Sequence, residues 1–294
     1  MKIGLFAIGI GTAAHPGVIR AAAETAERTG FATVWAPEHI VLFDSHESKY
    51  PYNDTGKFAT PADFDWLDPF LALTYAAAVT SKIRLATGIC LVPERNPLIL
   101  AKEIATLDRL SSGRFALGVG IGWLKEEFDA LGVAFERRAQ RTREYIDVMR
   151  RLWREPVVTH SGEFVRFENA RSYPKPPQGA KVPIWFGGES EPALRRVAAY
   201  GDGWFGFNLN PAQAGERITR LRALIKERGR ERDHFEIIAS PYTQQITRDD
   251  LKRYRDAGVE EIPMGINLKD NPAEVRAQVE QMSVDWVEPA AKIS

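Results

Sequence analysis

Short apolar runs alternate with longer amphipathic segments along the whole chain of 294 residues. Runs of this length, rich in branched and aromatic side chains, are typical of buried strands. The predicted strands span residues 3–8, 33–36, 83–91, 115–119, 182–186, 204–207, 235–239 and 261–266. Strands separated by helices are parallel and joined by right-handed crossovers, so the alternation predicts a parallel sheet.

In the intervening segments, apolar residues recur every three or four positions, which predicts helices packed on that sheet. The clearest example, residues 138–153, carries its apolar face on Tyr145, Ile146, Met149, Leu152 and Trp153. The other helices are expected at 17–29, 69–80, 97–110, 191–200, 211–228, 247–257 and from 272 to about 286. Several begin with a capping side chain followed by proline, a common helix start.

Eight strand–helix pairs are what a (β/α)8 TIM barrel requires, and we expect residues 1–294 to form one such α/β domain. A doubly wound open sheet is the alternative. It favours an early glycine-rich turn that binds a dinucleotide. The segment Gly9-Ile10-Gly11 matches that turn only in part, because Ala14 stands where the third glycine belongs.

Composition removes several classes of function. The 39 basic and 39 acidic residues balance, which argues against a nucleic-acid-binding protein, and 44% hydrophobic residues argue against a disordered chain. The single Cys90 excludes an internal disulfide and a cysteine-based metal site, and fits a reducing compartment such as the cytoplasm. No metal-ligand spacing of His and carboxylates is present. No run of about 18 apolar residues predicts a membrane span.

Two connections are long. The one after the second strand, residues 37–67, should lie where the carboxyl ends of barrel strands meet, which is where such barrels place their active sites. It is rich in aromatic residues suited to an apolar or planar substrate, namely Phe43, Tyr50, Tyr52, Phe58, Phe64 and Trp66.

The other long connection, residues 155–181, contains a proline-rich stretch. We expect an extended linker at the opposite face of the barrel, with no chemistry.

The residues that follow the second strand, Glu38 and His39, are the candidates for proton chemistry. Imidazole titrates near neutral pH and can act as acid or base. Glu38 could orient the His39 ring, provided that the chain turns and the two side chains converge. The alternative is that His39 only orders the loop. Structural or surface roles are expected for His15, His160 and His234, and position alone does not assign His46.

Glycines follow the fourth and fifth strands. Gly118 and Gly120 would let a flat ring approach the backbone, or else would serve tight packing inside the barrel. Gly187 and Gly188 precede a helix, where free N–H groups favour a phosphate. The alternative there is a plain turn. A bulky side chain at position 188 is expected to weaken ligand binding.

Several of these segments coincide with those of one family. Residues 107–123, LDRLSSGRFALGVGIGW, resemble the hallmark segment of the luciferase-like monooxygenase superfamily. Residues 35–39, 95–97, 101–102, 183–188 and 199–204 are similar to the same family pattern, and the match covers nearly the whole chain. The chain further resembles the subgroup that uses the deazaflavin coenzyme F420.

The resemblance implies a TIM barrel with the cofactor at the carboxyl ends of the strands and Glu38 and His39 beside its redox-active ring. It implies a non-prolyl cis peptide within Thr87, Gly88 and Ile89, backbone contacts from Gly118 and Gly120, and a phosphate at Gly187 and Gly188. The resemblance extends to Arg95, Asn96, Trp123 and Ser190, at positions that vary between subgroups of the family. Family members are commonly homodimers.

The implied activity is hydride transfer between reduced coenzyme F420 and a small organic substrate. The alternative on the same scaffold is an FMN-dependent monooxygenase that takes reduced flavin from a separate reductase and activates oxygen. Two further possibilities are a flavin-binding protein without turnover and a barrel isomerase or lyase acting on a phosphorylated ligand. A flavin-binding protein without turnover would lack the acid and the histidine after the second strand. A barrel isomerase or lyase would carry a Lys or a pair of Glu at strand ends.

Overall fold

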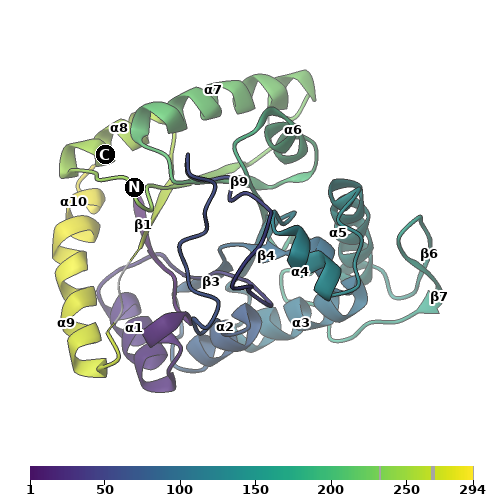
Figure 1. The fold of residues 1–294 in the computed structure, drawn as a ribbon, viewed down its shortest axis with the longest axis horizontal. Coiled ribbons are helices and arrows are strands. Elements are labelled where there is room, and N and C mark those ends of the chain that lie inside the picture. Colours follow the sequence, from purple (N-terminus) through teal and green to yellow (C-terminus); the bar gives the residue numbers. More distant parts are fainter. Residues whose placement is uncertain (232, 266–268, 294) are drawn as a thin grey trace.

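Parallel strands form the centre of the molecule in the computed structural model, which describes residues 1–231, 233–265 and 269–293 (Figure 1). Among these residues the barrel strands are β1 Lys2–Phe6, β2 Thr33–Ala36, β3 Arg84–Thr87, β5 Phe115–Gly120, β8 Ile184–Gly187, β9 Gly203–Phe207, β10 Glu236–Ser240 and β11 Glu261–Gly265. Each pairs in parallel with its neighbours, and the pairing of β3 with β5 closes the ring. The predicted TIM barrel is confirmed.

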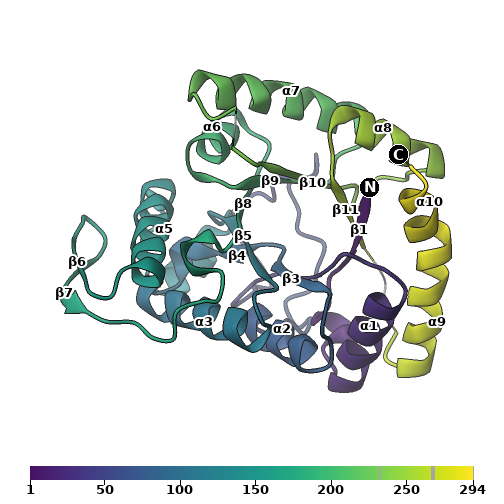
Figure 2. The ribbon, with the colours of Figure 1, turned by 180° about the vertical axis from the view of Figure 1, so that it is seen from behind.

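Helices surround the strands on all sides (Figures 1 and 2). The principal ones are α1 Pro16–Arg28, α2 Pro69–Ala78, α3 Pro97–Leu110, α5 Arg138–Arg154, α6 Glu191–Tyr200, α7 Pro211–Glu227, α8 Arg248–Ala257 and α9 Pro272–Met282. The predicted caps are present: the carboxylate of Asp68 and the amide oxygen of Asn96 each accept backbone N–H groups at the start of their helices. No helix in the described ranges is long and apolar enough to span a membrane.

The structure departs from the sequence prediction at four places. The predicted third strand is divided into β3 and a short β4, Cys90–Leu91. The division falls at a cis peptide between Gly88 and Ile89, which confirms the non-prolyl cis peptide implied by the resemblance. A further helix, α4 Lys125–Ala130, follows β5. The last helix passes through a π-helical turn, Ser283–Val287, into α10, Glu288–Ala291. Ile266, predicted to end the eighth strand, lies outside the described residues.

The connection 155–181 is the fourth difference, because it is more than the extended linker that we predicted. It contains an antiparallel hairpin of β6 Val158–Ser161 and β7 Arg166–Ala170. The carboxylate of Glu144 on α5 accepts the backbone N–H groups of Glu163, Phe164 and Val165. The hairpin turn is therefore fixed against the helix by one side chain, a long-range contact that short strands do not reveal in the sequence.

One side chain from each of several strands fills the barrel interior. Trp35, Trp185 and Phe205 contact one another, with ring centroids 5.1–5.3 Å apart for the pairs that include Trp35. Below them Glu261 is buried; its carboxylate accepts the indole N–H of Trp35 at 3.0 Å. Burial raises the pKa of Glu261. This packed layer leaves the carboxyl ends of the strands, called the barrel mouth below, as the end open to chemistry.

Candidate active site

His39 lies at the barrel mouth, just after β2, and its side chain is only 8% exposed. Its Nδ1 is 3.0 Å from Oε2 of Glu127 on α4. The second oxygen of Glu127 accepts the backbone N–H groups of Ile40 and Val41 at 2.6 and 3.1 Å. A carboxylate can only accept, so this contact makes Nδ1 the donor. Nε2 makes no hydrogen bond with a described residue and is left for chemistry.

Glu38 points elsewhere, which corrects the hypothesis that it orients the His39 ring. Its carboxylate accepts the backbone N–H of Leu91 at 2.5 Å and the Nε–H of Arg95 at 2.7 Å. Arg95 also pairs with Asp68, and its guanidinium lies 5.0 Å from the ring centroid of Phe70. Successive side chains of an extended segment point in opposite directions, and Pro37 does not make these two converge. Glu127 takes the expected role.

Sequence reasoning missed Glu127. It lies 88 residues after His39 on a helix that the apolar pattern did not predict. The available signal was the acidic pair Glu126-Glu127, which follows the glycine-rich end of the fourth strand and therefore falls at the barrel mouth. An acidic residue at that position could have been paired with His39 on topology alone.

Glu94 is a second acid at the mouth that the sequence did not single out. It is 6% exposed, and neither carboxyl oxygen has a hydrogen-bond partner. A Cβ added to Gly122 would lie 2.7 Å from Oε1, so the carboxyl group sits directly over that glycine. Burial, and then the charges of Glu127 and Glu38, raise the pKa of Glu94 to about 10. The group is therefore a neutral carboxylic acid near pH 7.

The predicted ring-contacting residues meet around the side chain of Ile89. A Cβ on Gly120 would lie 2.5 Å from Cδ1 of Ile89, and a Cβ on Gly187 would lie 3.0 Å from the same atom. At Gly118 a Cβ would lie 2.0 Å from the carbonyl oxygen of Thr87. Gly118 thus meets the backbone of the neighbouring strand, which is the packing alternative. Gly120 and Gly187 likewise fit the packing alternative, because the Ile89 side chain fills the space that a Cβ would need.

Gly188 forms the turn from β8 into α6 with φ of +104°, a conformation suited to glycine. Its carbonyl accepts the indole N–H of Trp204 at 2.9 Å. The next side chain, Glu189, turns toward β9, where it accepts the backbone N–H of Phe207 at 2.8 Å. Burial raises the pKa of Glu189 to about 7. Ser190 then caps α6 by accepting the backbone N–H of Ala193.

Aromatic side chains enclose His39. The ring centroids of Phe58 and Trp66 each lie 5.2 Å from the imidazole, and that of Trp123 lies 6.0 Å away. Beside them the long connection encloses a cavity of about 400 Å³. Its lining is formed by Leu42, Phe43, Asp44, His46, residues 58–63 and Leu124. The aromatic loop therefore both shields the imidazole from water and supplies a pocket of ligand size.

The other predicted histidines have structural contacts. His15 caps α1 by accepting the N–H of Gly17, and His160 pairs with Glu144 on the outer surface of α5. His46 contacts the carbonyl oxygen of Ser48 at 2.8 Å, inside the long connection. Asn96, to which the resemblance gives a role, caps α3.

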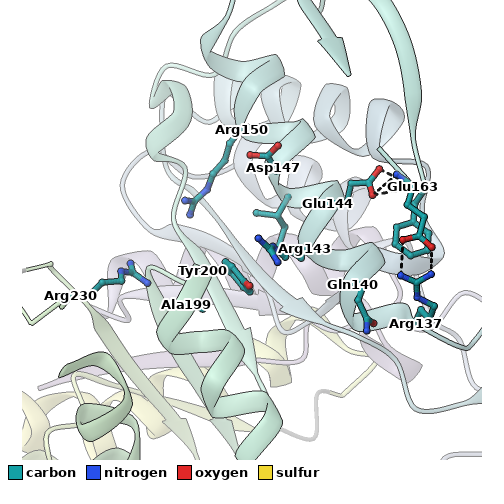
Figure 3. Close-up of a pocket in the computed structure, with 12 residues that line it drawn as sticks. Arg137, Gln140, Arg143, Glu144, Asp147, Arg150, Glu163, Ala199, Tyr200 and Arg230 are labelled. Atoms are coloured by element: carbon teal, nitrogen blue, oxygen red, sulfur yellow. Dashed lines mark hydrogen bonds and ion pairs between the residues drawn. The ribbon is translucent and has the colours of Figure 1, made fainter. Parts of the chain in front are cut away.

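A larger cavity, of about 840 Å³, lies outside the barrel between α5 and α6 (Figure 3). Most of its charges are neutralised within the protein. Arg137 pairs with Glu163, and Arg150 pairs with Asp202 at 2.8 Å. Arg143 extends over the ring of Tyr200, 5.0 Å from its centroid. His39 is not among the residues that line this groove.

The sequence model described as luciferase-like monooxygenase matches residues 1–282. The chain belongs to that family. It is 36% identical over 249 residues to the uncharacterized protein Rv0953c of Mycobacterium tuberculosis, covering 84% of this chain and 86% of the relative. Members of the luciferase-like family are oxidoreductases or monooxygenases that depend on F420 or flavin, so the chain is a redox enzyme.

Two solved structures share the luciferase-like fold over nearly the full length. An F420-dependent secondary alcohol dehydrogenase in complex with an F420-acetone adduct has a TM-score of 0.77 at 20% identity, covering 98% of each chain. The monooxygenase RslO1 from Streptomyces bottropensis has a TM-score of 0.76 at 22% identity, covering 98% of this chain and 99% of its own. At these identities the likeness shows the fold alone.

Proposed function

We propose that this luciferase-like enzyme transfers a hydride between coenzyme F420 and a small organic substrate, with His39 moving the accompanying proton. The observation that carries the proposal is the His39–Glu127 pair at the barrel mouth. The buried carboxylate fixes the imidazole through Nδ1 and can stabilise its protonated form. Nε2 can then donate a proton to an oxygen or nitrogen atom of the substrate, or remove one from it.

The residues present fit a planar cofactor. Gly120 and Gly187 let the side chain of Ile89 lie close against the backbone of β5 and β8, and a planar ring would pack against Ile89 at this place. When bound, the deazaflavin supplies or accepts the hydride. The chain's own residues orient the ring, and Phe58, Trp66 and the other aromatic side chains around His39 exclude water. The similarity to the F420-dependent alcohol dehydrogenase supports this choice of cofactor.

The cavity inside the long connection supports a small substrate. Its volume of about 400 Å³ falls within the usual range for small-molecule sites. The lining combines the apolar side chains of Phe43, Phe58 and Leu124 with polar groups, among them Asp44, His46 and Asp63. A small molecule that carries a reducible or oxidisable polar group beside an apolar part matches this lining.

An FMN-dependent monooxygenase, supplied with reduced flavin by a separate reductase, is the second candidate. Its support is the likeness to RslO1, whose TM-score nearly equals that of the alcohol dehydrogenase. Both candidates place a planar ring at the same glycines. They differ in reaction with oxygen, because a reduced deazaflavin reacts poorly with it and a reduced flavin reacts readily.

Titration of the purified protein with F420 and with FMN, followed by fluorescence quenching, tests the assignment. We expect micromolar binding of F420 and much weaker binding of FMN. The reverse order supports the monooxygenase, and absence of binding by either contradicts both candidates. His39→Ala should retain F420 affinity within a few-fold while turnover falls by about 10²–10⁴-fold. Normal turnover in this variant would make His39 a structural residue of the loop.

We further propose a cytoplasmic homodimer. Leu71 on α2 and Ile99 on α3 are 73% and 60% exposed, at the starts of two helices that pack side by side. A second copy would cover these apolar side chains. Light scattering should give twice the mass of one chain for the wild type and a single chain for Ile99→Lys. Val284→Lys, at an exposed apolar site on another helix, is the control and should remain dimeric. A monomeric wild type contradicts the proposal.

A further inference from the structure

The cavity inside the long connection lies directly beside His39. Phe58 belongs to its lining, and the ring centroids of Phe58 and His39 are 5.2 Å apart. His46 belongs to the lining as well, and its ring centroid lies 5.5 Å from that of Trp123, which also contacts His39. A molecule in this cavity of about 400 Å³ is therefore a neighbour of the imidazole, and the lining selects which molecules reach it.

The acidic side chains in this lining have no counter-charge. Asp44 and Asp63 belong to it, and no lysine or arginine does. Both residues are exposed, and neither carboxylate has an ion pair or a hydrogen bond with a residue that the structure describes. The groove between α5 and α6 differs in this respect, because Arg137, Arg143 and Arg150 line it (Figure 3). The cavity beside His39 therefore carries uncompensated negative charge.

The histidine in the lining adds an acceptor. Nδ1 of His46 lies 2.8 Å from the carbonyl oxygen of Ser48. A carbonyl oxygen only accepts, so Nδ1 is the donor and, in the neutral ring, Nε2 carries the free lone pair. The aspartates and His46 therefore all offer acceptors to the cavity, and the hydroxyl of Thr60 in the same lining can accept too. A ligand that supplies N–H donors and a positive charge is complementary to these groups.

The connection that encloses the cavity is acidic as a whole. Residues 37–67 contain six acidic residues and two lysines, although the charges of the complete chain balance. Among the described residues, only Glu38 of these six forms an ion pair, with Arg95. Charges of one sign gathered at an entrance raise the local concentration of molecules of the opposite sign. The same charges repel anions.

The cavity suits an organic cation rather than a metal ion. The described part of the chain holds no group of three or more His, Cys, Asp or Glu side chains placed to bind a metal. Apolar surface instead accompanies the carboxylates, from the rings of Phe43 and Phe58 and the side chain of Leu124. The face of an aromatic ring attracts an ammonium group, and the hydrocarbon part of a ligand leaves water by packing on the same side chains.

We propose that this cavity binds a small organic molecule with a protonated primary amino group, and that Asp44 and Asp63 receive the ammonium group. The three N–H donors of the ammonium group match the acceptors of the lining. Its hydrocarbon part packs against Phe43, Phe58 and Leu124. As a statement of the substrate class, the inference rests on the proposed function. The binding site itself depends only on the lining and can be tested without a cofactor.

Three ligands that share one ring and differ in charge test the site: cyclohexylamine, cyclohexanol and cyclohexanecarboxylate. Their binding to the protein without cofactor is measured by ligand-observed NMR titration at pH 7. We expect the amine to bind at least about ten-fold more tightly than the alcohol, and the carboxylate to bind most weakly. Asp44→Asn and Asp63→Asn should each weaken binding of the amine by about 3- to 30-fold. Binding of the alcohol should change by less than about two-fold.

Asp54→Asn is the matched control, because it removes the same charge from the same connection at a residue that does not line the cavity. It should change the affinity for the amine by less than about two-fold. Equal weakening by the control would show that only the overall charge of the connection matters, and would contradict the site. An amine that binds no more tightly than the alcohol overturns the inference, as does an equal loss of both ligands in Asp44→Asn and Asp63→Asn.

The F420 and FMN titrations separate this inference from the proposed function. A preference for the amine that both aspartate variants reduce supports the site even if neither F420 nor FMN binds, a result that contradicts the proposed function alone. Binding of F420 together with no preference for the amine contradicts the inference and leaves the proposed function standing.

Discussion

Oε2 of Glu127 lies 3.0 Å from Nδ1 of His39, although the two residues are 88 positions apart in the chain. The other oxygen of the same carboxylate receives the N–H groups of the two residues that follow His39. One fully buried side chain therefore fixes both the imidazole and the backbone on which it is carried. Glu127 is a positioning residue in this arrangement, because it acts on the substrate only through His39.

Glu127→Gln should reduce turnover, because an amide oxygen can still accept a hydrogen bond but cannot balance the charge of a protonated imidazole. We expect a loss of about 10- to 1000-fold in kcat, with cofactor affinity nearly unchanged. Glu126→Gln is the control. Its carboxylate accepts the N–H groups of Glu47 and Ser48 on the same connection without touching His39. Similar losses in both variants would mean that the acids only anchor the connection.

Glu38→Gln should act mainly on stability. The Glu38 side chain is 1% exposed and pairs with Arg95, and breaking a buried pair typically costs about 3–5 kcal/mol. Glu103→Gln removes a half-exposed partner of the same arginine and should cost less than about 1 kcal/mol. Urea unfolding of both variants checks this. If Glu38→Gln instead unfolds normally and loses as much turnover as His39→Ala, Glu38 takes part in proton transfer.

Glu94 should make the protein less stable as the pH rises. Its pKa is about 10 in the folded protein against an ordinary 4.5, so between these values the folded state binds more protons than the unfolded state. The free energy of unfolding then falls by up to about 1.4 kcal/mol per pH unit from this group. Glu94→Gln removes the titration. In urea unfolding, the free energy of unfolding of Glu94→Gln should therefore exceed that of the wild type by a margin that widens between about pH 6 and pH 9. If the two free energies change with pH in parallel, Glu94 is already ionised in the folded protein.

Gly188→Val should destabilise the fold, so it cannot report on ligand binding alone as the sequence suggested. The residue has φ of +104°, and an added Cβ would lie 2.9 Å from Cβ of Ala193. Gly132→Val is the control, since Gly132 also has a positive φ but would meet nothing within 4 Å. Thermal unfolding should show a loss of about 1–3 kcal/mol for the control and more for Gly188→Val. Equal losses would mean that α6 shifts to accept the side chain.

The barrel could be predicted because its signals are local. Each strand is marked by its own apolar run, and helices such as those starting at Pro69 and Pro97 are marked by a cap, a proline and an apolar face. His39 was found because a residue just after a barrel strand must lie at the mouth. These inferences need only the order of elements, not the contacts between side chains.

The partner of His39 could not be predicted in the same way. Which acid meets the imidazole depends on how α4 lies over the mouth, and α4 is a six-residue helix with almost no apolar periodicity. Glu94 was missed because what sets it apart is a buried carboxyl group without a hydrogen-bond partner. No sequence pattern records the absence of a partner. The role of Glu38 was misassigned because its true partner, Arg95, is 57 residues away in the chain.

The connection between β2 and α2 is fastened unevenly. Glu127 and Glu126 bind the backbone at residues 40–41 and 47–48, Asn208 binds the carbonyl of Tyr52, and the backbone pairs again at residues 65–67. Among the described residues, every hydrogen bond of residues 53–64 stays within the connection itself. This stretch also lines the pocket beside His39. New residues or insertions at 53–64 could thus change which molecules the enzyme accepts while its proton-transfer pair stays in place, a division that lets specificity evolve separately from catalysis.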